Sequence, residues 1–179
     1  NKFWSLGEKG LLFEMSETRI YPHKNLFSHV LGQIDSDNNG ISGVEKYFDK
    51  DLKQNNRQSI QLSLDTNLQY LIRDELFKSI SVFRAKGAAS LLMDVNTGEI
   101  LSLISLPDYN LNTRKDIKDE SFTNKITKGV FEMGSIFKTF TIALALEDNL
   151  FSPNTLVKNI PDKIQCSKYT IKEHDEMPN

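Results

Sequence analysis

A serine and a lysine three residues apart, Ser135 and Lys138, are the residues of this chain best suited to covalent chemistry. Residues three apart on a helix share a face, so the lysine amine can reach the serine hydroxyl. A serine whose proton is taken by a neighbouring base becomes a nucleophile. Gly134 permits a tight turn just before the serine, which would leave Ser135 at the start of a helix. The spacing therefore predicts a serine nucleophile and a lysine general base.

Lys138 must be neutral to accept a proton near pH 7, and the residues after it bear on this requirement. They are apolar almost all round the helix, which predicts that the helix is buried. Burial and the positive end of a helix dipole both favour the neutral amine. A simpler interpretation is that Ser135 only caps the helix while Lys138 extends to water. The pair by itself leaves both interpretations open.

The residues upstream predict the elements that would position this pair. Residues 59–64 alternate apolar and polar, which predicts a strand. Asp65 or Thr66 can cap the helix that follows, because apolar residues then recur at helical spacing up to Phe83. Two apolar runs, 88–93 and 100–106, flank an Asn-Thr-Gly turn and predict a hairpin that Pro107 ends.

The remaining segments give weaker signals. Turn residues cluster at Tyr21-Pro22 and at 35–40, and Gly32 closes a short apolar segment between them. Polar residues predict a connector at 50–58 and a loop from Asp108 to about Lys128. After Asn149, a second hairpin is expected through residues 168–171.

Composition narrows the class of protein. The net charge of −2 and a pI near 6.0 argue against a nucleic-acid-binding surface. Cys166 is the single cysteine, so an internal disulfide is impossible. No apolar run approaches the roughly 20 residues that span a bilayer. The abrupt start at Lys2-Phe3-Trp4 suggests the interior of a longer protein, which leaves an upstream membrane anchor open.

Several motifs, in one order along the chain, resemble the class B penicillin-binding proteins, and among them the septal cell-division peptidoglycan transpeptidases. The nucleophile motif Glu-x-Gly-Ser-x-x-Lys is present, as are motifs of the start of the catalytic domain, its first hairpin and the non-catalytic pedestal domain. In that order they are residues 132–138, 64–69, 94–109 and, for the pedestal, 19–22, 29–32 and 43–49.

The resemblance implies an α+β fold with part of a pedestal domain at 1–58 and the first part of a transpeptidase domain at 59–179. It implies that Ser135 attacks the penultimate D-alanine carbonyl of a peptidoglycan stem peptide while Lys138 takes its proton. The Ser135 backbone N–H would supply half of the oxyanion hole, and β-lactams would acylate the same serine. No cofactor, metal or nucleic acid is implied.

The family also implies partners and a location. These are a membrane glycan polymerase and other division proteins, at the outer face of the bacterial inner membrane, with the domain in the periplasm. Two departures stand out: Met133 replaces a common proline, and the strand motif Lys-Thr-Gly does not occur in these residues, so we expect the family's Ser-x-Asn and Lys-Thr-Gly motifs to follow Asn179. We therefore expect an internal fragment that is inactive alone and that exposes a sheet edge and an apolar helix.

Two other functions remain as alternatives. One is a non-catalytic division scaffold that retains the fold, and the other is a serine β-lactamase or β-lactam sensor. Residues 35–40 resemble the start of a calcium loop, but Lys46 occupies the twelfth position, so we expect a polar turn. The histidines at 23, 29 and 174 and Cys166 lack metal-ligand spacing. Four phenylalanines, at 122, 131, 137 and 140, are expected in the core, with substrate stacking as the alternative.

Overall fold

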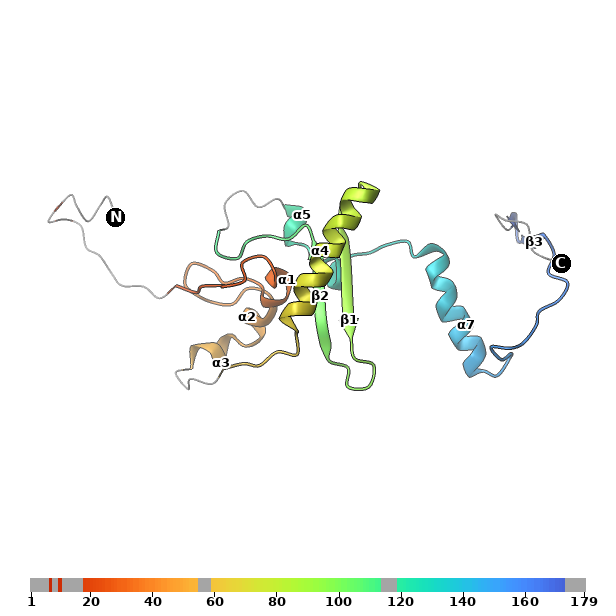
Figure 1. The fold of residues 1–179 in the computed structure, drawn as a ribbon, viewed down its shortest axis with the longest axis horizontal. Helices are drawn as coiled ribbons and strands as arrows, with labels where there is room; N and C mark the ends of the chain where they lie inside the picture. The colour runs from red at the N-terminus through yellow and green to blue at the C-terminus, as the bar shows by residue number, and fades with distance from the viewer. Residues whose placement is uncertain (1–6, 8–9, 11–17, 55–58, 114–118, 173–179) are drawn as a thin grey trace. The chain divides into compact units, whose positions relative to one another are not determined.

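The computed structural model describes residues 7, 10, 18–54, 59–113 and 119–172, which divide into two units at Val130/Phe131 (Figure 1). The elements of the first unit are α1 (Ser28–Leu31), α2 (Gly43–Tyr47), α3 (Asp49–Lys53), α4 (Thr66–Phe83), β1 (Ala88–Met93), β2 (Ile100–Leu106), α5 (Asp119–Phe122) and α6 (Lys125–Lys128). Those of the second are the 3₁₀ helix η2 (Gly134–Phe137), α7 (Lys138–Glu147), β3 (Lys163–Cys166) and β4 (Tyr169–Lys172). The mixture of helices and antiparallel strands confirms the predicted α+β class.

Helix α4 begins where the sequence predicts it. The Asp65 carboxylate accepts hydrogen bonds from the backbone N–H groups of Asn67 (2.8 Å) and Leu68 (2.9 Å). A cap of this kind stabilises a helix by about 1 kcal/mol. The helix ends at Arg84, which adopts the left-handed conformation. Both cap signals are local, which is why the sequence shows them.

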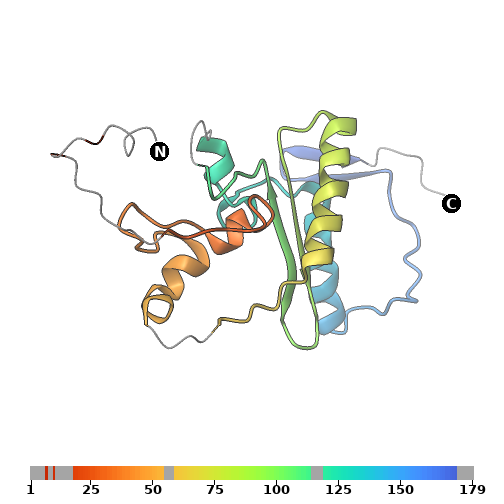
Figure 2. The ribbon, with the colours of Figure 1, turned by 60° about the vertical axis from the view of Figure 1, so that its left-hand side comes forward.

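The hairpin β1–β2 also has its predicted bounds. The strands are antiparallel, with Ala88 opposite Leu106 and Leu91 opposite Leu103. The turn is closed by the Asp94 side chain, which accepts from the backbone N–H groups of Asn96 and Thr97, and Gly98 has a φ of +76°. Helix α4 packs along the hairpin, as two views show (Figures 1 and 2).

Gln69, on α4, fixes how the helix sits on the hairpin. Its side chain is fully buried. The amide nitrogen donates to the carbonyl oxygens of Leu26 (2.9 Å) and Leu103 (2.8 Å), and the amide oxygen accepts from the Ser102 hydroxyl (2.8 Å) and the Leu103 N–H (3.0 Å). Both amide protons and both oxygen lone pairs are therefore paired.

The segment before α1 packs on the chain that follows β2. Tyr21, Tyr109 and Leu111 form a buried apolar cluster with Leu31 at its edge. The Asn112 side chain bonds both backbone groups of Tyr21, accepting from its N–H (2.9 Å) and donating to its carbonyl (2.8 Å). Residues on either side of the predicted domain boundary at 58/59 thus share one core, while residues 55–58 lie outside the described structure and that boundary stays a prediction.

An ion pair strengthens the same junction. The buried Asp108 carboxylate accepts from Arg73 on α4, with Nε at 2.6 Å and the terminal nitrogen at 3.1 Å. It also accepts from the Asn25 amide at 3.1 Å. The Arg73 guanidinium lies over the Phe77 ring, 4.7 Å from its centroid. Three separate segments therefore meet at one buried carboxylate.

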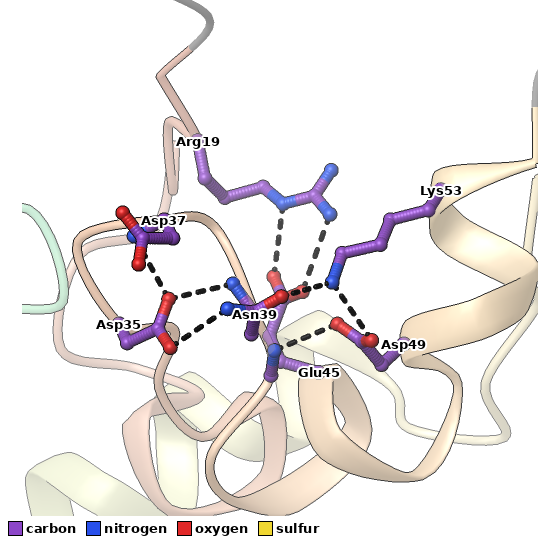
Figure 3. A network of polar contacts seen from close by, with 8 residues as sticks. Arg19, Asp35, Asp37, Asn39, Glu45, Asp49 and Lys53 are labelled. Carbon is purple, nitrogen blue, oxygen red and sulfur yellow. Dashed lines mark hydrogen bonds and ion pairs between the residues drawn. The ribbon is translucent and has the colours of Figure 1, made fainter.

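A second buried carboxylate, Glu45 on α2, lies near the start of the described chain (Figure 3). It forms an ion pair with Arg19 at 3.2 Å and accepts from the Tyr21 hydroxyl at 3.0 Å. Close backbone packing holds α1 and α2 together here. At Gly32, an added Cβ would lie 2.1 Å from the Ser42 carbonyl oxygen, so only glycine fits.

Three predictions from local pattern differ from the structure. Residues 59–64 form no strand; the Ser63 hydroxyl donates to the Ile100 carbonyl of β2 (2.8 Å), and the N–H of the capping residue Asp65 donates to the Leu101 carbonyl (2.9 Å). The connector predicted at 50–58 begins inside α3, and the loop predicted from Asp108 contains α5 and α6. These short helices depend on tertiary contacts, which the local pattern does not contain.

The second unit holds the predicted second hairpin, β3–β4, with Ile164 opposite Ile171. Its other elements are η2 and α7. All described residues of β3 and β4 are exposed, and nearly all of α7 is exposed as well. Within the described residues, no helix is long and apolar enough to cross a membrane.

We predict that Gln69→Leu strongly destabilises the protein. The change leaves the N–H of Leu103, the Ser102 hydroxyl and two carbonyls without their partner. Each unsatisfied buried group costs about 1–3 kcal/mol, so the free energy of unfolding should fall by roughly 3 kcal/mol or more. Urea denaturation measures it. Gln61→Leu is the control, because Gln61 is exposed and bonds only its neighbour's carbonyl; equal losses in the two variants would refute the role of Gln69.

We further predict that His29 makes stability depend on pH. Burial lowers the pKa of His29 below 6.5, against the opposing effects of its bond to the Ser121 carbonyl (2.7 Å) and of Asp108. The unfolded chain therefore takes up the proton first, and stability falls as pH drops from about 7 through the folded pKa.

Thermal unfolding between pH 7 and 5.5 tests this prediction. Lowered carboxylate pKa values, such as those of Asp35 and Asp94, act at lower pH and leave this window clear. His29→Gln should flatten the fall in Tm, whereas His23→Gln, an exposed control, should not. A His29→Gln variant with the wild-type pH dependence would contradict the assignment.

Candidate active site

Ser135 lies in the 3₁₀ helix η2, directly after a glycine turn. Gly134 has a φ of +54°, the left-handed region that glycine enters without steric cost. The Ile136 N–H donates to the Met133 carbonyl across the turn at 3.2 Å. The prediction of a tight turn at Gly134 with Ser135 at the start of a helix is confirmed.

Lys138 is the first residue of α7, one 3₁₀ turn beyond Ser135. Its backbone N–H bonds the Ser135 carbonyl. A 3₁₀ helix has three residues per turn, so side chains at i and i+3 eclipse one another. The Ser135 and Lys138 side chains thus leave the backbone on the same side of the helix. Among the described residues, however, the hydroxyl and the amine form no hydrogen bond with each other or with a third residue. In particular, Ser135 does not serve as a side-chain cap of η2.

The expected burial of this helix is wrong for the described structure. Phe137 and Phe140 contact each other, with ring centroids 5.5 Å apart, yet they are 60% and 62% exposed. Phe131 is equally exposed and Phe122 is 40% exposed, so the predicted core of phenylalanines is also wrong. Among the described residues of the second unit, the elements beside α7 are η2 and a two-stranded hairpin, and both are themselves exposed.

Lys138 is exposed with the rest of the helix, so the described residues do not bury it. Exposure of the apolar helix is nevertheless what we expected of this chain by itself. The structure therefore supplies the nucleophile and the base at the right spacing. It does not supply the environment that would activate the base.

The segment that leads to this helix is anchored in a way that sequence analysis missed. Asn124 caps α6, accepting from the N–H groups of Ile126 (3.0 Å) and Thr127 (3.4 Å). The buried Ser105 hydroxyl on β2 accepts from the Lys125 N–H at 2.9 Å and donates to the Thr123 carbonyl at 3.2 Å. The Asn124 cap signal was present in the sequence, whereas the long-range bond to Ser105 had no local signal.

Residues 35–40 form the expected polar turn (Figure 3). The Asp35 carboxylate accepts from the backbone and side-chain nitrogens of Asn39 at 2.8 and 2.9 Å, and these bonds lower the pKa of Asp35. The Lys53 ammonium bonds both Asn39 (2.6 Å) and Asp49 (2.9 Å). Across the described ranges, no three His, Cys, Asp or Glu side chains gather as metal ligands; His174 lies outside them.

Comparisons with known proteins identify the family of this chain. Residues 88–178 match the family described as penicillin binding protein transpeptidase domain. The "Probable peptidoglycan D,D-transpeptidase FtsI" of Caulobacter vibrioides is 37% identical over 147 residues, covering 80% of this chain and 25% of the relative. The "Peptidoglycan D,D-transpeptidase FtsI" of Escherichia coli K12 is 30% identical, covering 87% of this chain and 30% of the relative.

A solved structure agrees on the fold. Penicillin binding protein 3 of Mycobacterium tuberculosis superposes with a TM-score of 0.75 at 24% identity, covering 89% of this chain and 38% of that one. This chain thus spans about a quarter to a third of the length of the two curated relatives. Because the family match takes in half of the chain and includes Ser135 and Lys138, the chain belongs to the penicillin-binding protein transpeptidase family.

Proposed function

We propose that this chain carries the nucleophile and the general base of a peptidoglycan D,D-transpeptidase that cross-links stem peptides during septal cell-wall synthesis. One observation carries the proposal. Ser135 follows a left-handed glycine and lies one 3₁₀ turn before Lys138, in a chain that belongs to the transpeptidase family. The names of the curated relatives support the reaction class.

The proposed reaction has two halves. In the first, Ser135 Oγ attacks the carbonyl of the penultimate D-alanine, and the Lys138 amine takes the hydroxyl proton. The tetrahedral intermediate then collapses to an ester on Ser135, and the terminal D-alanine leaves with a proton returned from Lys138. In the second, an amine of a neighbouring stem peptide attacks the ester, which forms the cross-link and frees the serine.

Two features of the chain bear on this chemistry. Ser135 lies in the first turn of η2, where backbone N–H groups have no partner within the helix, so its N–H is suited to bind the developing oxyanion. Lys138 must give up its proton before it can act as a base, and burial of an amine favours its neutral form. The proposal therefore requires a surface that covers Lys138 in the working enzyme.

The same proposal extends to inhibitors, domains, partners and location. We propose that β-lactams acylate Ser135; penicillin binding protein 3, which shares the fold, has been solved with ampicillin and with aztreonam. Residues 1–58 are proposed as pedestal and 59–179 as transpeptidase domain. A membrane glycan polymerase and division proteins are the proposed partners, with an inner-membrane anchor and a periplasmic domain.

A division scaffold is the second candidate, and the exposure of Lys138 is the observation that favours it. A scaffold needs only the fold, so an unactivated base would be of no consequence. A serine β-lactamase would instead hydrolyse β-lactams with turnover. The three functions thus differ in what they do to a stem peptide and to a β-lactam.

We predict that Ser135→Ala abolishes cross-linking of stem peptides by the full-length gene product, a loss on the order of 10³-fold or more. Lys138→Arg should also lose activity, because a guanidinium stays protonated and cannot act as a base. Lys128→Arg, at an exposed position at the end of α6, is the control that should keep the wild-type rate. The measurement is the rate of dimer formation from purified stem peptides.

Two outcomes would overturn the proposed function. Unchanged cross-linking in Ser135→Ala, or growth and division supported by that variant, would favour the scaffold. Rapid hydrolysis of a β-lactam without any cross-linking would favour a β-lactamase.

A further inference from the structure

The last element of the first unit before the Ser135 segment is α6, and a single hydroxyl holds its start. The Ser105 side chain is 1% exposed and lies on β2 opposite Ala89. Its hydroxyl oxygen accepts a hydrogen bond from the Lys125 N–H, and the hydroxyl donates a hydrogen bond to the Thr123 carbonyl. The hydroxyl is therefore hydrogen-bonded to the backbone on both sides of Asn124.

Other contacts also hold the start of α6 against the hairpin. The Asn124 side chain caps α6, which packs on both strands of the hairpin. The Lys125 side chain runs across Gly87, where an added Cβ would lie 2.7 Å from Lys125 Cε and 2.6 Å from the Leu106 carbonyl oxygen. The start of α6 is thus fixed to the hairpin both by Ser105 and by close packing at Gly87.

These contacts at α6 bear on the proposed reaction because the nucleophile segment follows α6 closely along the chain. Only residues 129–133 separate α6 from Gly134, and Ser135 comes next. Displacement of a catalytic group by about 1 Å can cost on the order of 10²-fold in rate. The start of α6 is thus anchored at a point close in sequence to the catalytic turn.

We propose that Ser105 is a positioning residue for the reaction of Ser135, acting through the backbone at Asn124. The inference rests on the proposed function and gives a role to Ser105, which the sequence analysis included only as part of the first hairpin. Ser105 does not touch the substrate; it sets the point from which the nucleophile segment leaves the hairpin.

The test measures the second-order rate of acylation by a fluorescent penicillin in the full-length gene product at 25 °C, with Tm measured in parallel. Ser105→Ala should slow acylation about tenfold or more. Ser105→Thr keeps the hydroxyl and should restore the rate to within about threefold of wild type. Asn124→Ala, which removes the cap of α6, should slow acylation as well, and it provides a second variant if Ser105→Ala folds poorly.

Ser102→Ala is the matched structural control. Ser102 is an equally buried serine on the same strand, but its hydroxyl bonds Gln69 rather than the backbone at Asn124. It should lower Tm and leave the acylation rate of the folded protein unchanged. A rate loss in Ser105→Ala that Ser102→Ala shares at equal Tm would mean a purely structural role and would overturn the inference.

The possible failures are distinguishable. If the wild type is acylated and Ser105→Ala is acylated equally fast, this inference alone is overturned. If the folded wild type is not acylated at all, the proposed function fails and the positioning role fails with it. A slow Ser105→Ala variant with fast Ser105→Thr and Ser102→Ala variants would establish the role.

Discussion

The side-chain amide of Gln69 directs all four of its hydrogen bonds to two separate parts of the chain, the turn before α1 and strand β2. In a fully buried position, any unmade bond would be costly, so helix α4 can neither slide nor rotate on the hairpin without losing several of them. This constraint fixes where β2 lies. From β2, the Ser105 hydroxyl fixes the start of α6, and α6 leads to the nucleophile segment.

Buried polar contacts likewise join the predicted pedestal residues to the first residues of the predicted transpeptidase domain. Gln69 reaches back to Leu26, Arg73 and Asn25 meet at Asp108, and His29 bonds the Ser121 carbonyl. These are polar contacts in buried or half-buried positions, where geometry matters more than burial of apolar area. The first unit is therefore held together by directional bonds around a small apolar cluster rather than by a large hydrophobic core.

Local signals in the sequence predicted the elements whose determinants are local. The Asp65 cap gave the start of α4, and the Asn-Thr-Gly turn gave the hairpin with its bounds. Residues 59–64 alternate as a strand does, yet they lack a partner for a ladder, and alternation alone cannot supply one. The short helices α5 and α6 are bonded to His29 and Ser105, which are distant in sequence; the Asn124 cap is a local signal for the start of α6, but these long-range bonds have no local signal.

The candidate site likewise has features that depend on local sequence and features that depend on distant residues. Its spacing, its glycine turn and its place at a helix start are local, and the sequence predicted all three. Burial of α7 depends on another surface packing against it. The apolar pattern therefore predicted that the helix is suited to burial, but it could not show whether such a surface is present. The proposed nucleophile and base are therefore identified by the spacing of Ser135 and Lys138, while the described residues of the second unit leave the lysine exposed.

If Ser135 is the residue that becomes acylated, a β-lactam must leave a covalent adduct on its side chain. The full-length gene product would be treated with penicillin and digested, and its peptides would be analysed by tandem mass spectrometry. We expect one acylated peptide, with the added mass on Ser135. An adduct on a different residue, or a folded protein that forms no adduct, would show that Ser135 is not the nucleophile.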